Sequence, residues 1–346
     1  MIGDRIKQAR HAAGLSQRAL AERAQISAMA VSKYENGKAT PSSTVLLSLA
    51  DALNVRVEYF LRPEHVELEM QGYRKHHTAP NRLLDRIKAD VKEKLERFLE
   101  LEAVLPVLPV GEFRVPRALA DRIDTYVDVE RAAADLREAW GLGVNPIPEL
   151  IDTCEEHGIR VFRTSIPHDE HFDGLAALVR GNPVIILGED WPGDRQRFTL
   201  AHELGHLVLE GRLAKDLDME LAANRFAGAF LVPEQAARRA LGDKRHWLEP
   251  RELWLLKQEY GLSMAGWLHR ARDLGIIPDQ TYKRLRQEFK ARGWLKKEPF
   301  GDYPGEQPRV FEQLVYRALA EDLIGESKAA ELMGKPLMQF HSECTA

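Results

Sequence analysis

Cysteine is scarce in this chain, since only Cys154 and Cys344 occur among 346 residues. Two thiols so far apart cannot build a disulfide framework or a multi-cysteine metal site, so we expect both to be free. Long apolar runs are missing too, because stretches such as 103–110 fall far short of the ~18 residues of a spanning helix. Asp4 and Arg5 have no apolar run behind them, which excludes a secretory signal. These absences predict a cytoplasmic protein that makes no contact with membrane.

Internal repeats and low-complexity tracts are also lacking. The apolar fraction of 44% and the charged fraction of 29% are typical of globular proteins and exclude wholesale disorder or a coiled-coil rod. The net charge of −4 is unevenly distributed, because residues 1–62 carry nine basic and five acidic side chains, or +4, which leaves −8 for the remainder. We therefore expect only the basic N-terminal segment to approach a polyanion.

The first sixty residues have apolar positions at helical spacing and no alternating segment. Ser16 and Ser27 each precede a helical run, where a serine hydroxyl can cap the first turn. Asn36-Gly37 predicts a turn, and Pro41-Ser42-Ser43 predicts the start of another helix. The pattern indicates about five short helices in this segment.

These residues resemble the XRE-type helix-turn-helix domain of phage repressors. The resemblance implies that helix 28–35 enters the major groove of an operator in double-stranded DNA, and that Arg10 and Glu35 form an ion pair. Matching positions are Gly14-Leu15-Ser16-Gln17, Leu20-Ala21, Ala24, Ile26-Ser27, Val31-Ser32-Lys33-Tyr34-Glu35-Asn36-Gly37, Pro41-Ser42, Leu49-Ala50 and Leu53.

The DNA contacts that we predict lie on one side of helix 28–35 and beside it. Ala28 and Met29 can offer apolar contacts, as to a thymine methyl, whereas Lys33 can donate to guanine or phosphate. The remaining candidates contact the DNA backbone or a base edge. The full predicted set is Gln17, Arg18, Ala28, Met29, Ser32, Lys33, Asn36 and Lys38.

Residues 81–105 form a predicted helix that is rich in charge and has apolar residues near heptad spacing, interrupted by Lys94. A single helix-turn-helix domain binds a half-site weakly, so we expect a homodimer. The helix could be the dimer seam or could lie on the following domain, and the interrupting lysine favours the second.

A metal-binding pattern follows in the acidic part of the chain, where segments 159–163, 175–180 and 184–187 resemble strands among helices. The predicted helix 194–210 contains His202-Glu203-Leu204-Gly205-His206. Histidines at i and i+4 project from one face and can reach one Zn²⁺, while the glutamate between them can address a water. Glycine inside a helix costs about 1 kcal/mol relative to alanine, so we expect another backbone to approach Gly205 closely.

A third ligand is available on the next predicted helix, 219–232. Glu220 and Asn224 share a face there, so Glu220 can bind metal while Asn224 orients a histidine. A surface glutamate and a capping asparagine are the alternatives.

The runs Arg197 to His206, Glu220 to Ala227 and Leu231-Val232-Pro233 resemble the ImmA/IrrE family of zinc metallopeptidases. The resemblance implies a zincin-like α+β domain in which one Zn²⁺ per chain is held by His202, His206 and Glu220, a gluzincin-like set. Glu203 is then the catalytic base, and an XRE-type repressor protein is the substrate. Candidates for stabilising an oxyanion are His171, Arg197, Tyr260 and His269.

The overall expectation is an α+β multidomain chain with an all-α five-helix N-terminal domain. We predict a helix-turn-helix domain at 1–65, a helical linker or dimer helix at 66–110, a metallopeptidase domain at 111–245 and a helical region at 246–346. In that last region we expect an exposed loop at 299–308, a helix pair at 311–333 and a frayed tail from 336.

Two functions are compatible with these features. The first is a DNA-binding regulator, associated with the nucleoid, whose zinc endopeptidase cleaves a repressor-type protein or its own linker during stress or mobile-element control. The second is a transcription regulator or antitoxin-like protein that cleaves nothing and whose zinc domain senses a metal, a ligand or a partner.

Overall fold

The computed structural model describes residues 2–61, 81–106, 111–165, 172–179 and 181–345. These residues form helices and one three-stranded sheet. The chain divides into two compact units, which are described separately below. The first comprises 1–108, 166–171 and 311–346, and the second comprises 109–165 and 172–310. None of the described helices is both long and apolar enough to cross a bilayer.

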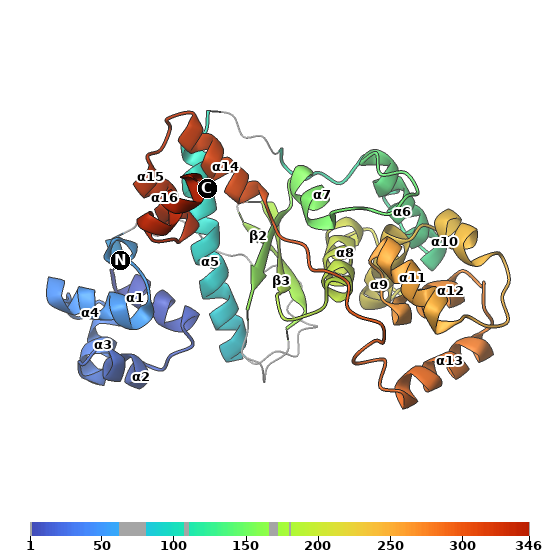
Figure 1. The fold of residues 1–346 in the computed structure, drawn as a ribbon, viewed down its shortest axis with the longest axis horizontal. Helices are drawn as coiled ribbons and strands as arrows, with labels where there is room; N and C mark the ends of the chain where they lie inside the picture. The colour runs from blue at the N-terminus through green and yellow to red at the C-terminus, as the bar shows by residue number, and fades with distance from the viewer. Residues whose placement is uncertain (1, 62–80, 107–110, 166–171, 180, 346) are drawn as a thin grey trace. The chain divides into compact units, whose positions relative to one another are not determined.

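The first unit begins with the predicted group of five short helices, the last of which is a 3₁₀ helix (Figure 1). Ser16 and Ser27 cap their helices as predicted, and Ser42 does the same, because each hydroxyl accepts a backbone N–H three residues later. The elements are α1 Ile2–Ala12, α2 Gln17–Arg23, α3 Ala28–Glu35, α4 Ser43–Leu53 and η1 Val57–Leu61.

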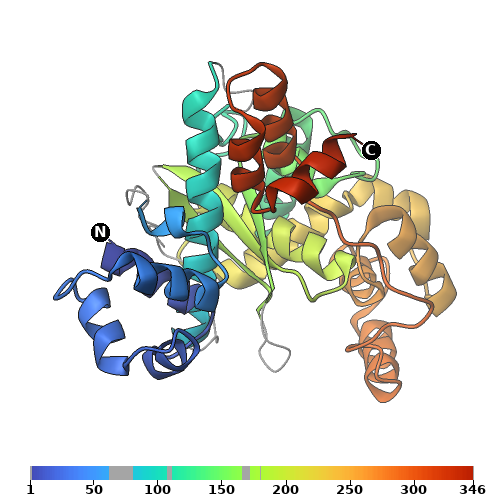
Figure 2. The ribbon, with the colours of Figure 1, turned by 60° about the vertical axis from the view of Figure 1, so that its left-hand side comes forward.

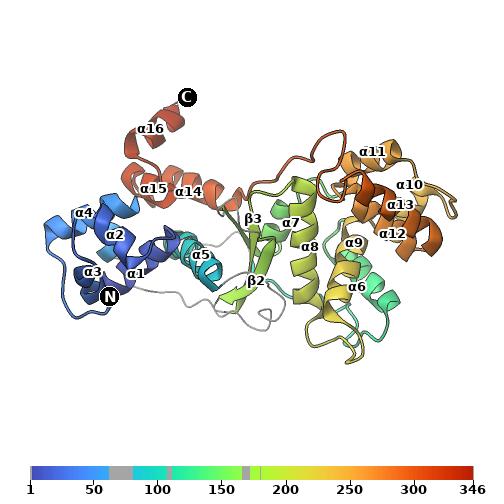
Figure 3. The ribbon, with the colours of Figure 1, turned by 90° about the horizontal axis from the view of Figure 1, so that it is seen from below.

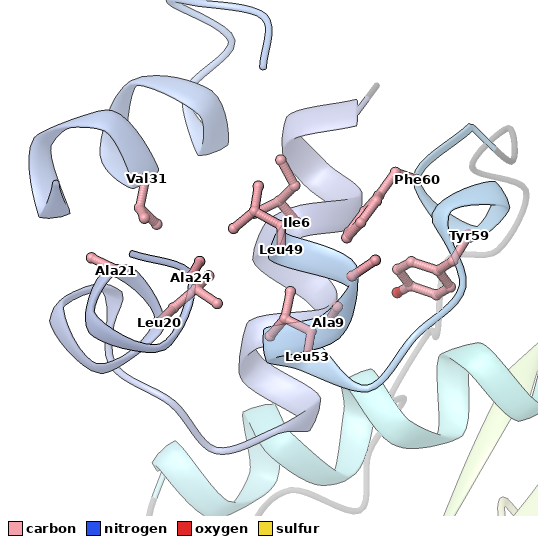
Figure 4. Close-up of a cluster of buried hydrophobic side chains, with 11 residues drawn as sticks. Ile6, Ala9, Leu20, Ala21, Ala24, Val31, Leu49, Leu53, Tyr59 and Phe60 are labelled. Atoms are coloured by element: carbon pink, nitrogen blue, oxygen red, sulfur yellow. The ribbon is translucent and has the colours of Figure 1, made fainter. Parts of the chain in front are cut away.

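A small hydrophobic core holds these helices together (Figure 4). Each element contributes at least one buried side chain, for example Ile6 from α1, Leu20 from α2, Val31 from α3, Leu49 from α4 and Phe60 from η1. The apolar residues at helical spacing thus converge on one centre, which leaves the outer face of α3 open to solvent.

Helix α5, Asn81–Val104, packs against α1 and against α15, Glu326–Met333, within the same unit. Figure 2 shows the C-terminal helices beside α5. A buried ion pair joins Arg5 to Glu96, and the ring of Phe98 stacks on Phe311 at 5.6 Å between centroids. The partners of α5 therefore include residues from both ends of the chain, which the sequence did not indicate.

The C-terminal tail is helical, so the prediction of a frayed tail from 336 was wrong. The predicted pair 311–333 corresponds to α14, Val310–Ala320, and α15, and a further helix α16, Leu337–Thr345, follows. Phe340 of α16 is fully buried and stacks on Tyr316 of α14, with the ring centroids 5.7 Å apart. This long-range contact stabilises the helical conformation of the tail.

The second unit is α+β, as predicted. Its sheet has the order β1-β3-β2, with β3 parallel to β1 and antiparallel to β2. Figure 3 shows α8 between the sheet and α9. The strands are β1 Arg160–Thr164, β2 Gly174–Val179 and β3 Asn182–Gly188, and the helices are α6 Tyr126–Ala139, α7 Leu150–Glu156, α8 Gly193–Leu209, α9 Met219–Leu231, α10 Glu234–Leu241, α11 Pro250–Tyr260, α12 Met264–Asp273 and α13 Asp279–Ala291.

The segment 299–308 is a mostly exposed loop, as its prolines and glycines predict, but one of its residues is buried. Glu306 is buried, forms an ion pair with Arg197 of α8 and accepts the backbone N–H of Ile151 at 2.7 Å. The backbone oxygen of Tyr303 also accepts the N–H of Gly193, at the start of α8, at 3.0 Å. The segment is therefore fastened to α7 and α8 at two residues.

Candidate metal centre

Helices α8 and α9 lie against each other, and Gly205 is at their contact. A Cβ added at Gly205 would lie 3.0 Å from Cδ1 of Phe226, which is fully buried on α9. The expected close approach is therefore made by a side chain and not by a backbone, which corrects the sequence-based expectation. This contact brings the two helices that carry the predicted ligands close together.

His202, His206 and Glu220 converge on one point between these helices. Nε2 of His202 is 3.0 Å from Nε2 of His206, and the carboxylate oxygens of Glu220 lie 3.3 Å and 3.2 Å from these two nitrogens. All three side chains offer ligand atoms within 4.8 Å of one another. Their separation in sequence is bridged by the packing of α8 on α9.

Asn224 lies one turn beyond Glu220 and contacts the outer nitrogen of His202. Its Oδ1 is 3.0 Å from Nδ1 of His202. An amide oxygen can only accept, so Nδ1 carries the proton and Nε2 presents its lone pair to the cluster. The contact is compatible with the predicted role of Asn224 in orienting His202, which stays a prediction.

Glu203 lies beside the edge of the sheet and is 5% exposed. Burial raises the pKa of Glu203 to about 7, although the charge of His202 and the backbone N–H of Ala176 on β2 act in the opposite direction. Burial lowers the pKa of His202, but its hydrogen bond with Glu220 and the two nearby carboxylates outweigh this and raise it above its usual value. Burial and neighbouring charges therefore raise the pKa values of both His202 and Glu203 above their ordinary values.

The chemistry of this donor set fits a divalent cation. Two imidazole nitrogens and one carboxylate are a common set for a zinc site that keeps a position open for water or substrate. The three side chains together with Asn224 provide both the ligand atoms and a group that fixes one imidazole. A His₂Glu set also accepts other divalent ions.

The candidates for oxyanion stabilisation have other contacts where they are described. Arg197 donates to Glu306 and to the backbone oxygen of Ile147, Tyr260 is buried against Trp267, and His269 contacts Tyr282. His171 lies outside the described residues. Sequence reasoning missed two neighbours of the cluster, the N–H of Ala176 and the ring of Phe198. For Phe198 a signal was available, because it lies four residues before His202 and so shares its helix face.

The predicted DNA contacts are found on α3 and around it. Ala28, Met29 and Lys33 are exposed, Ser32 is half-buried, and Asn36 donates to the backbone oxygen of Ser32 at 2.7 Å. Arg18 and Lys38 are also exposed.

The ion pair of Arg10 and Glu35 is present, with N–O distances of 2.5 Å and 3.0 Å. Gln17 Nε2 also donates to Glu35, at 2.6 Å. Gln17 is thereby held at the start of α2, and the ion pair ties α1 to the end of α3.

Comparison with known families assigns two parts of the chain. Residues 154–272 match the IrrE N-terminal-like domain (Peptidase_M78), and residues 6–60 match a helix-turn-helix family (HTH_3). No curated protein matched the chain. Among solved structures, Bacillus thuringiensis PlcR in complex with the peptide PapR7 and DNA is 13% identical over 99% of this chain and 97% of that chain, with a TM-score of 0.18, too low for any structural argument. The chain therefore joins a helix-turn-helix segment to an IrrE N-terminal-like segment, the fusion that the two sequence resemblances predicted.

Proposed function

We propose that this chain is a DNA-binding transcription regulator with a zinc-dependent endopeptidase site. The observation that carries the proposal is the convergence of His202, His206 and Glu220 beside the buried Glu203. The family match over 154–272 favours metallopeptidase chemistry there, and the match over 6–60 favours DNA binding in the same chain.

In the proposed mechanism, zinc would be held by His202, His206 and Glu220 and would act as a Lewis acid on a peptide carbonyl. Glu203 takes a proton from the attacking water and passes it to the leaving amine. A pKa near 7 suits both roles, because the group can gain and lose a proton at neutral pH. Asn224 keeps the imidazole of His202 in position during both steps.

The sheet edge suggests how a substrate chain binds. β2 pairs with β3 on one side, and no described strand lies on its other side. Because the N–H of Ala176 donates to Glu203, it points away from β3 and towards the site. An extended peptide can add to such an edge, so we propose an extended segment of a repressor-type protein as the substrate. This segment belongs to another protein or to the chain's own 62–110, much of which lies outside the described residues.

Binding of operator DNA is assigned in the proposal to α3, with its exposed Met29 and Lys33. One helix-turn-helix reads a half-site, which favours a homodimer on a two-fold operator. Localisation with the nucleoid follows from the same proposal.

The test compares wild-type protein with Glu203→Gln and with Glu189→Gln, a control at an exposed residue after β3. Each protein is incubated with zinc, with DNA and with candidate repressor proteins, and metal content and chain integrity are measured by mass spectrometry. We expect about one zinc per chain in all three proteins. Cleavage should occur in the wild type and the control but not in Glu203→Gln. Full cleavage by Glu203→Gln would contradict the proposed chemistry.

The second candidate is a regulator or antitoxin-like protein whose metal domain only senses, and the fused helix-turn-helix segment favours it. It requires zinc binding without cleavage of any substrate, together with DNA affinity that changes in Glu220→Ala but not in Glu203→Gln. Those three proteins together with Glu220→Ala therefore distinguish the two functions.

A further inference from the structure

An exposed basic surface covers α13 and the turn that follows it. Seven basic side chains and one acidic side chain, Glu288, lie between positions 283 and 297. All seven basic residues are exposed. They form what we call the α13 basic surface, namely Lys283, Arg284, Arg286, Lys290, Arg292, Lys296 and Lys297.

These charges are largely uncompensated within the part of the chain that the structure describes. Arg292 pairs with Glu288 at 2.7 Å, whereas the polar contacts of Arg286 are to His269 and to the hydroxyl of Tyr282. Arg284 lies over the ring of Trp247. Among the described residues, the four lysines have no carboxylate partner, so the surface keeps most of its positive charge.

The helix presents part of this charge as a straight row. α13 buries Tyr282, Leu285 and Phe289, and it packs on α12. Lys283, Arg286 and Lys290 follow one another beside this buried stripe at spacings of three and four residues, and together they span about 10 Å at 1.5 Å per residue. Like charges at this spacing destabilise a helix. The row therefore lowers the stability of α13 unless a bound polyanion neutralises its charge.

We infer that the α13 basic surface binds the phosphate backbone of duplex DNA. This would be a second contact with DNA, independent of its sequence, in addition to the contact proposed for α3. The exposed side chains between 283 and 297 are mainly lysine, arginine and Gln287. The one large apolar side chain exposed among them is Leu295, at 37%, which is too little to form the apolar centre that protein interfaces bury, and this favours DNA over an acidic protein. The inference rests on the proposed DNA binding of the same chain. Once one site is bound, the other meets DNA at a high effective concentration.

This inference changes the expectation that only residues 1–62 approach a polyanion. The charge of −8 over the rest of the chain is an average, and it conceals a local excess of six positive charges between 283 and 297. A duplex responds to such a local excess because salt screens charges beyond about 10 Å.

The test uses the full chain and a short random-sequence DNA duplex with a fluorescent label, titrated over a series of salt concentrations. The test variant is K283Q/R286Q/K290Q. The matched control, R131Q/K215Q/R239Q, removes three exposed charges from other parts of the same unit. Thermal unfolding of each variant verifies that the fold is kept. A third variant, R18Q/K33Q/K38Q, tests the helix-turn-helix segment on its own.

We expect the slope of log affinity against log salt to become shallower by about 2.7 in the α13 variant if all three side chains contact phosphate. The control should keep the wild-type slope. If the α13 variant had the same slope as the control, the inference would be overturned. The inference would also fail if the α13 variant bound polyglutamate more weakly but bound DNA unchanged, because the partner would then be an acidic protein. If R18Q/K33Q/K38Q binds DNA as the wild type does while the α13 variant binds it more weakly, the proposed role of α3 fails and the α13 contact stands.

Discussion

At the scale of single residues, Gly205 determines how closely α8 approaches α9. An alanine there would press on Phe226, which cannot move because it is fully buried and stacks on Phe230. We predict that Gly205→Ala destabilises the protein by about 1 kcal/mol, because the strain outweighs the gain in helix propensity. Urea unfolding measures this difference.

Gly228 on α9 is the matched control. A Cβ added there meets Arg270 Cδ at 3.7 Å, an ordinary contact. Gly228→Ala should therefore stabilise the protein by about 0.5–1 kcal/mol. If both alanine variants were more stable than the wild type, the close contact of Gly205 with Phe226 would not constrain the packing of the two helices.

A second prediction at this scale concerns Glu155. Burial raises the pKa of this carboxyl to about 8, although backbone N–H groups of Arg309 and Val310 pull it down. The native state then holds a proton that the unfolded chain loses above its ordinary pKa near 4.5. The stability from this group is fully present below pH 4.5 and is lost as the pH rises to about 8.

Glu155→Gln should remove this dependence, because the amide stays neutral. The wild type should lose roughly 1.4 kcal/mol of stability per pH unit relative to this variant across that window. Urea unfolding at several pH values provides the measurement. Glu156→Gln, a change at an exposed neighbour, serves as the control, and an equal response in both variants would rule out Glu155 as the cause.

At the scale of elements, α16 depends on one aromatic side chain. Phe340 is fully buried, whereas Met338 two residues earlier is 81% exposed. We predict that Phe340→Ala costs about 3–5 kcal/mol in the unit that contains residues 311–346, since a large buried ring leaves a cavity. Met338→Ala should change stability by less than about 0.5 kcal/mol. Differential scanning calorimetry of both variants measures these losses of stability. Equally small losses in Phe340→Ala and Met338→Ala would contradict an ordered tail.

Elements with local signals were predictable from the sequence. Helix 28–35 was predicted with its final bounds because Ser27 caps it, and the helix of His202 was predicted within one residue at each end from its periodicity. Elements stabilised by distant contacts were not predictable. The order of the tail depends on Phe340 meeting Tyr316, and the burial of Glu306 depends on Arg197, more than a hundred positions away.

The candidate site shows the same division. Spacing alone placed His202 and His206 together, because i and i+4 positions share a helix face. Glu220 is on another helix, so its place as the third ligand came from the family resemblance and depends on the packing of α8 on α9. The N–H of Ala176 at Glu203 was not predictable, since it depends on which edge of the sheet β2 occupies. Local periodicity carries no information about that edge.

At the scale of the whole molecule, the two compact units should respond separately to ligands. Each has its own core, and the cluster of His202, His206 and Glu220 lies in the second unit alone. A ligand that binds only the native state of one unit stabilises that unit by RT ln(1 + [L]/Kd), about 2.7 kcal/mol at a hundredfold excess over Kd.

We therefore predict two thermal transitions, of which zinc raises only one. Gly205→Ala should lower the transition that zinc raises, and Phe340→Ala should lower the other, so the two variants assign the transitions without cutting the chain. Calorimetry with and without zinc gives the result. Because His202 and His206 must lose their protons to bind metal, the shift should also shrink as the pH falls below neutral. A single transition that moves in response to zinc and to both variants would show that the units unfold together, in which case metal binding could act on the DNA-binding helices through the stability of the whole chain.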